Sequence, residues 1–160
     1  MVDLINVLFY KGRLFVPTFG ITPSRVRLVI EPVYVAEFDR DSLVQAIQAV
    51  REAGLPEVEE MPYSEYRKQD PILKATKARS WKALAREGLA YSIYWPADAD
   101  EVQIILPKVD KKGRFAPLMK EDKVWRIVHF PKDTPIEELA EFILEDIRKR
   151  KGGAIEERNP

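Results

Sequence analysis

Two apolar runs near the N-terminus, separated by only three residues, most constrain what this chain can fold into. Residues 4–10 (LINVLFY) and 14–19 (LFVPTF) flank a Lys-Gly-Arg break, and a central glycine in so short a break indicates a β-hairpin. Strands joined in this way are antiparallel and present an apolar face that the rest of the chain must cover. Because Pro17 has no N–H to donate, we expect the second strand to lie at a sheet edge or to end there.

A third run, residues 25–38, alternates between apolar and polar positions as a half-buried strand does. Val26, Leu28 and Ile30 share one face of this predicted strand. Pro32 interrupts the alternation, which predicts either two strands or one strand with a β-bulge. The N-terminal third of the chain is therefore rich in β-structure.

The middle of the chain predicts a helix and then an irregular segment. Residues 39–53 can be capped by Asp39 or Asp41 and carry apolar residues at helical spacing, before a glycine and a proline that end the helix. Residues 55–73 contain three prolines and no clean period. We expect a loop there, with a short helical turn around 63–69, and long ordered loops are often functional.

The elements expected in the second half of the chain, taken with those of the first half, predict one α+β domain. A helix is expected at 74–87 with Trp81 on its apolar side, and a final helix is expected to follow a Thr-Pro-Ile-Glu start signal at 134–137. Strands are expected at 89–95, 101–107 and 124–130. This order favours a single domain over residues 1–151, built on an antiparallel or mixed central sheet of five to six strands with about three helices, and a flexible tail at 152–160.

Composition limits the chemistry and the location of the protein. The absence of cysteine from the 160 residues excludes disulfides, thiolate zinc sites and a cysteine nucleophile, and it suits a reducing cytoplasm. No apolar run reaches the roughly 18 residues of a membrane span. Asp3 stands where a signal peptide carries a basic residue. We therefore expect a cytoplasmic protein that does not enter a membrane.

Catalytic motifs are missing from the sequence. His129 is the only histidine, and its apolar neighbours in a predicted strand indicate a packed or half-exposed strand residue. The carboxylate pairs Asp39/Asp41 and Asp98/Asp100 fit helix capping and turn solvation, although a carboxylate-dependent hydrolase with one raised pKa stays open as an alternative. No GxSxG elbow and no glycine-rich phosphate loop occurs. We expect a protein without enzymatic activity, metal or cofactor.

Charge is segregated along the chain although the formal net charge is zero. Residues 37–65 contain eight acidic and two basic side chains, and residues 67–86 contain seven basic and one acidic. The two blocks could neutralise each other, be solvated faces, or supply a partner surface. The candidate partner-binding residues in and beside the acidic block are Glu57, Glu59, Glu60, Tyr63, Glu65 and Tyr66. The alternative basic surface, with an aromatic beside its cations as in nucleic-acid binders, comprises Lys74, Lys77, Arg79, Lys82 and Arg86.

The order of motifs over roughly residues 30–150 resembles a family of bacterial immunity proteins from contact-dependent growth inhibition systems. The central stretch is YRKQDPILKATKARSWKALAREGLAYSIYWPADADEVQIILP, in which a tyrosine-containing loop precedes a basic helix and two strands. The positions that carry the resemblance are Tyr66, Lys77, Ala83-Leu84, Tyr91-Ser92-Ile93, Ile104–Pro107 and Pro131–Glu138. The chain lacks the usual cysteine near the first C-terminal strand and the family's Trp-Gly feature, for which Trp125 is only a rough counterpart.

The resemblance implies an α/β or α+β fold without catalysis and a cognate protein toxin, commonly a nuclease, as partner. An acidic loop would be steered toward the cationic cleft of a nuclease, which points to the acidic candidates above. A nucleic-acid-binding protein that uses the basic residues is the alternative. The sequence does not distinguish a monomer from a dimer.

Overall fold

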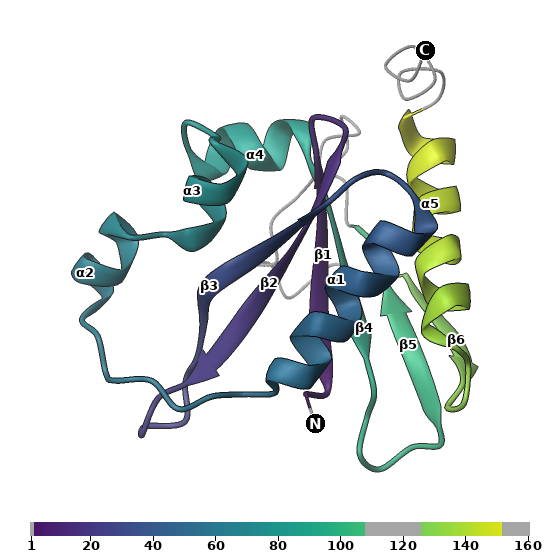
Figure 1. The fold of residues 1–160 in the computed structure, drawn as a ribbon, viewed down its shortest axis with the longest axis horizontal. Coiled ribbons are helices and arrows are strands. Elements are labelled where there is room, and N and C mark those ends of the chain that lie inside the picture. The colour runs from purple at the N-terminus through teal and green to yellow at the C-terminus, as the bar shows by residue number, and fades with distance from the viewer. Residues whose placement is uncertain (1, 108–125, 152–160) are drawn as a thin grey trace.

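The computed structural model describes residues 2–107 and 126–151 and shows an α+β fold built on one six-stranded sheet. The strand order is β3-β2-β1-β4-β5-β6, and every neighbouring pair is antiparallel (Figure 1). The strands are β1 (Leu4–Tyr10), β2 (Arg13–Ile21), β3 (Arg27–Ala36), β4 (Leu89–Tyr94), β5 (Glu101–Ile105) and β6 (Ile127–Pro131). The α+β prediction and its antiparallel sheet are confirmed.

Two long helices and three short ones complete the described fold. They are α1 (Arg40–Ala53), α2 (Tyr63–Lys68), α3 (Pro71–Thr76), α4 (Trp81–Glu87) and α5 (Ile136–Lys151). The first of the two predicted caps begins α1, since the Asp39 carboxylate accepts a hydrogen bond of 2.7 Å from the Ser42 amide. The expected helical turn around 63–69 is present as α2.

The larger core lies between the sheet and the two long helices. Alternate residues of β1, among them Ile5 and Val7, face this side and are fully buried. Leu43 and Ile47 of α1 and Ile143 of α5 are equally buried against them. Figure 1 shows α1 and α5 side by side in front of the sheet.

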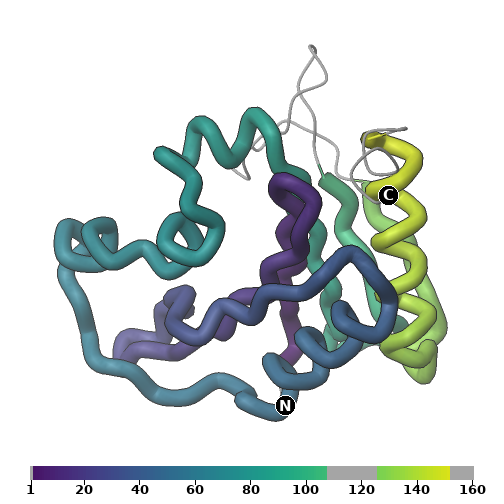
Figure 2. The backbone as a smooth tube through the Cα atoms, turned by 45° about the horizontal axis from the view of Figure 1, so that its top comes forward, coloured from purple at the N-terminus to yellow at the C-terminus, as the bar shows by residue number. Residues whose placement is uncertain are grey.

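A smaller core lies on the opposite face, at the β1–β3 end of the sheet. Leu8 and Tyr10 of β1 and Phe15 of β2 are buried there together with Leu84 of α4. Helix α3 contacts β2 and β3 on this side. Figure 2 shows α2 farthest from α5, with α3 and α4 between α2 and the sheet.

The expectation for Pro17 is wrong, because β2 is an interior strand that continues to Ile21. The register with β3 shifts immediately after Pro17, from Pro17↔Val33 to Thr18↔Ile30. Two residues of β3, one of them Pro32, therefore have no partner residue on β2, and the Thr18 hydroxyl donates to the Pro32 carbonyl over 2.7 Å. The missing N–H of Pro17 is directed toward β1, beyond Leu8↔Phe15, the last residue pair between β1 and β2, so the proline breaks no hydrogen bond of the sheet. Of the two readings of residues 25–38, one strand with a bulge is correct.

The single helix expected at 74–87 is also wrong, since it is divided into α3 and α4. Lys77 adopts a left-handed conformation with φ of 60° and ends α3, and the Thr76 hydroxyl donates to the Ile72 carbonyl over 2.8 Å. Ser80 then begins α4 by accepting the Ala83 amide over 3.1 Å. Side-chain hydrogen bonds of Ser and Thr compete with a continuous helix, and here they terminate one and start another.

Two predictions fall partly or wholly outside the described residues. The first two residues of the strand expected at 124–130 and the tail at 152–160 are not among them. In the described ranges, no helix is both long and apolar enough to cross a membrane.

Tyr91 links the sheet to α5 through the larger core. Its hydroxyl donates to Asp146 over 2.6 Å, and Asp146 also accepts from Arg150 over 2.5 Å. Burial, followed by the neighbouring Asp146 carboxylate, raises the pKa of Tyr91, so this phenol stays protonated and donating.

Replacing Tyr91 with Phe removes this donor while keeping the ring. We expect Tyr91→Phe to lower the free energy of unfolding by about 1.5–3 kcal/mol, the usual range for a hydrogen bond to a charged group. Urea unfolding measures the change. The matched control Tyr94→Phe, on the opposite face of β4, should change it by less than about 0.5 kcal/mol. Equal effects would contradict the role given to Tyr91.

Candidate partner-binding surface

The predicted acidic candidates lie on a segment that is tied to the sheet at its start. Residues 56–58 form a parallel bridge with the end of β2, in which the Ile21 amide donates to the Pro56 carbonyl and the Val58 amide donates to the Ile21 carbonyl, both over 2.9 Å. A side chain at Gly20 would place its Cβ only 2.7 Å from Cγ1 of Val58. Glycine thus permits the close approach that holds this segment against β2.

Glu60 provides the second attachment. Its carboxylate accepts the backbone N–H of Ser24 over 2.7 Å, in the loop between β2 and β3. Hydrogen bonds from Ser24 hold the pKa of Glu60 below its ordinary value. Glu60 therefore orders the segment and is not simply a free surface charge.

Tyr66 provides the third attachment, at the edge strand β3. Its hydroxyl accepts the Val29 amide over 3.1 Å and donates to the Val29 carbonyl over 3.3 Å. Burial raises the pKa of Tyr66, which keeps the hydroxyl able to donate at neutral pH. One side chain thus satisfies both backbone groups that an unpaired edge residue would otherwise leave to water.

The remaining candidates face solvent between these attachments. Tyr63 is 73% exposed and Met61 is 40% exposed, and Glu57 and Glu59 are exposed beside them. Glu65 forms a 3.6 Å ion pair with Lys68 within α2. Glu57 and Glu59 take part in no ion pair within residues 2–107 and 126–151. We call residues 56–66 the acidic segment.

The structure divides the acidic candidates into two groups with different roles. Glu60 and Tyr66 attach the acidic segment to the sheet, whereas Glu57, Glu59, Tyr63 and Glu65 are available at its surface. A loop that is fixed before binding loses little conformational entropy when a partner docks, so this arrangement suits a binding surface.

The basic candidates lie on α3, α4 and their connection. Lys74 forms a 3.5 Å ion pair with Glu31 of β3, while Arg79, Lys82 and Arg86 are exposed. Trp81 is 47% exposed, and its indole donates to Asp70, the side chain that caps α3. Trp81 therefore lies beside the cations instead of on the apolar side of a helix. Among described ion pairs, only Lys68–Glu65 joins the two charged blocks, so they do not neutralise each other by pairing.

A polar cluster that sequence analysis did not assemble lies on β5 and β6. Gln103 is directly opposite His129, and both contact the Glu101 carboxylate, with the Gln103 amide at 2.9 Å. The hydrogen bond from His129 is the main cause that lowers the pKa of Glu101. Alternation in the predicted strands was the available signal, because it places these three residues on one face.

This cluster has a base and its orienting carboxylate but lacks a nucleophile among the described residues. Ser92 lies in the neighbouring cross-strand row and donates to Asn6 over 2.9 Å. Within the described ranges no group of three or more His, Cys, Asp or Glu side chains could hold a metal ion. The geometry is that of a hydrogen-bonded sheet face.

Comparison with known proteins gives a relationship at the level of the fold. No family model matches the chain, and no curated protein matches it. A solved structure of a protein of unknown function from Neisseria meningitidis is similar, with a TM-score of 0.56, 15% sequence identity, and coverage of 91% of this chain and 94% of that chain. At this identity the similarity concerns the fold alone.

Removing the Tyr66 hydroxyl should loosen the acidic segment and expose the edge of β3. We expect Tyr66→Phe to speed hydrogen exchange at the Val29 amide by about tenfold, corresponding to the loss of roughly 1.4 kcal/mol of local protection. Exchange measured by NMR reports it. Tyr63→Phe, on the exposed tyrosine of the same helix, is the matched control and should leave Val29 unchanged. An unchanged Val29 in both variants would show that Tyr66 does not attach the segment.

Proposed function

We propose that this chain is a non-catalytic binding protein of the cytoplasm that neutralises a cognate protein toxin by direct contact. The observation that carries the proposal is the tethered acidic segment, which presents exposed carboxylates beside an exposed tyrosine and methionine. The resemblance to immunity proteins of contact-dependent growth inhibition systems supports the same reading. A nuclease toxin, with its cationic substrate cleft, is the partner class that this surface suits.

The physical roles within the surface differ. Glu57 and Glu59 act over distance, because exposed carboxylates attract a cationic protein and raise the association rate. Tyr63 acts at contact, since a large aromatic side chain that enters a pocket of the partner can account for much of the binding energy. Together they would cover the cationic cleft of the toxin and exclude its substrate.

The proposal predicts that a toxin gene lies directly upstream, and the charge-reversal variant Glu57→Lys/Glu59→Lys tests it together with the product of that gene. We expect the two proteins to co-purify when co-expressed and the host to be protected. The variant should lower the association rate at least tenfold at about 50 mM salt, since it reverses the steering field. Stopped-flow binding and growth of the co-expressing host are the measurements.

The control Asp98→Lys/Asp100→Lys makes the same charge change in the exposed β4–β5 turn. It should reduce the association rate far less, because these two carboxylates lie outside the acidic segment. Failure of the wild-type pair to form a complex or to protect the host would overturn the proposed function. Equal effects of the two variants would overturn the assignment of the surface.

One observation favours a second function, nucleic-acid binding. The exposed indole of Trp81 lies among the basic side chains of α3, α4 and their connection. A stacking surface is thus combined with positive charge. This function predicts binding to single-stranded RNA that weakens steeply as salt rises.

The variant Lys82→Glu/Arg86→Glu separates the two functions. If the chain binds nucleic acid, this variant should abolish binding of a fluorescent single-stranded RNA at about 50 mM salt, whereas Glu57→Lys/Glu59→Lys should not weaken it. Fluorescence anisotropy measures both. No measurable binding of the wild-type protein at that salt concentration rules the second function out.

A further inference from the structure

Strand β3 is the outermost strand of the sheet on one side, and its backbone faces outward at alternate residues. The two-residue turn between β1 and β2 is flanked by the Tyr10↔Arg13 pair, which directs the backbone groups of Arg13 toward β1. Alternation then directs Leu14 and Val16 toward β3, where they are opposite Ala36 and Tyr34. The N–H and C=O groups of Val33 and Val35 consequently point away from the sheet.

The two halves of this edge differ in whether a side chain bonds to their outward backbone groups. Before the bulge, Tyr66 occupies the outward groups of Val29. After the bulge, no side chain of the described residues bonds to the backbone of Val33 or Val35, and the Val35 side chain is 50% exposed. Neither residue is a lysine or proline that would discourage the pairing of another strand.

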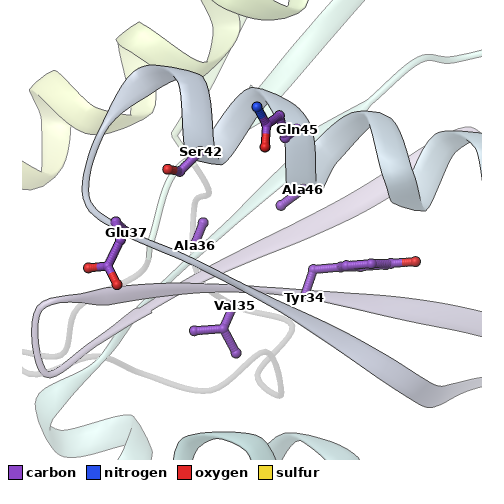
Figure 3. Close-up of a pocket in the computed structure, with 7 residues that line it drawn as sticks. All are labelled: Tyr34, Val35, Ala36, Glu37, Ser42, Gln45 and Ala46. Carbon is purple, nitrogen blue, oxygen red and sulfur yellow. The ribbon is translucent and has the colours of Figure 1, made fainter.

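Pockets flank the uncovered part of the edge on both faces. On the α1 side, a pocket of about 380 Å³ is lined by Tyr34, Glu37, Ser42 and Gln45 with their neighbours (Figure 3). On the α3 side, a second pocket of about 290 Å³ is lined by Glu31, Pro32, Val33, Pro71, Lys74 and Ala75. Figure 3 shows the Val35 side chain directed away from α1. A strand added here would place alternate side chains into the two pockets.

Charge selects the occupant of the edge. Glu37 stands at one end and is followed by Asp39, whereas Glu31 at the other end is already ion-paired with Lys74 over 3.5 Å. Two-fold pairing with a second copy centred on Tyr34 would bring Glu31 of one copy opposite Glu37 of the other. Pairing centred on Val35 would bring Glu31 opposite Asp39. Like charges opposite each other destabilise strand pairs, whereas a cationic strand would be stabilised in either register.

We propose that the β3 edge from Val33 to Val35 binds an extended, lysine- or arginine-containing peptide segment of a protein partner as an additional strand. The backbone groups of Val33 and Val35 supply the hydrogen bonds, and the carboxylate of Glu37 binds a cation that enters the α1-side pocket. This surface is separate from the acidic segment, so the inference does not depend on the proposed function.

The probe is a heptapeptide in which valine alternates with lysine or threonine. Its N-terminus is acetylated and its C-terminus is amidated. We expect it to shift the amide resonances of Val33, Val35 and the facing residues of α1, with saturation at a millimolar concentration or below. Glu37→Lys should weaken binding at least tenfold, and the matched control Asp98→Lys should not. Val35→Pro removes an outward N–H that no ladder bond uses, and it should abolish binding while the fold is kept.

A peptide N-methylated at alternate amides tests the same contact without altering the protein. It should fail to bind, because its backbone cannot pair with the edge. Shifts located elsewhere, equal binding of the methylated peptide, or equal binding of a peptide with glutamate in place of lysine would each overturn the proposal. A dimer in sedimentation velocity that Glu37→Lys strengthens and Val35→Pro dissociates would overturn it as well, because the occupant would then be a second copy.

Discussion

Strand β1 is the element on which the rest of the structure depends, because it contributes to both cores. Its alternate residues, Ile5 and Val7 against Leu8 and Tyr10, are buried on opposite faces of the sheet. A strand buried on both faces must have neighbours on both edges and helices on both sides. The β1–β2 hairpin and the β1–β4 pair supply the edges, and α1, α5 and the α3–α4 pair supply the helices.

Most of the fold could be predicted from the sequence because its signals are local. The hairpin, the alternating strands and the capped helix at Asp39 depend on periodicity and turn chemistry within a few residues. The position of Pro17 could not be predicted in this way, because the length of the pairing between β1 and β2 decides whether the missing N–H matters. The break in the helix expected at 74–87 depends on a competition between Thr76 and Ser80 hydrogen bonds and helix propensity that spacing alone does not reveal.

The region of the candidate surface could be predicted, but which of its residues attach it to the sheet and which face solvent could not. Composition located the acidic segment, since acids, prolines and tyrosines are concentrated there. That Tyr66 reaches Val29 and Glu60 reaches Ser24 involves partners 37 and 36 residues away in sequence, which no local pattern specifies. The same is true of Glu101 and His129, which strand pairing brings together across 28 residues.

The acidic segment and the β3 edge are physically connected through Tyr66. By occupying the outward groups of Val29, Tyr66 both fixes the segment and closes the first half of the edge, and the bulge at Pro32 separates this half from the second. An added strand is therefore confined to the short stretch at Val33–Val35. Such a short pairing supplies few backbone hydrogen bonds, so its specificity must come from the pockets on either face and from the acids at its ends.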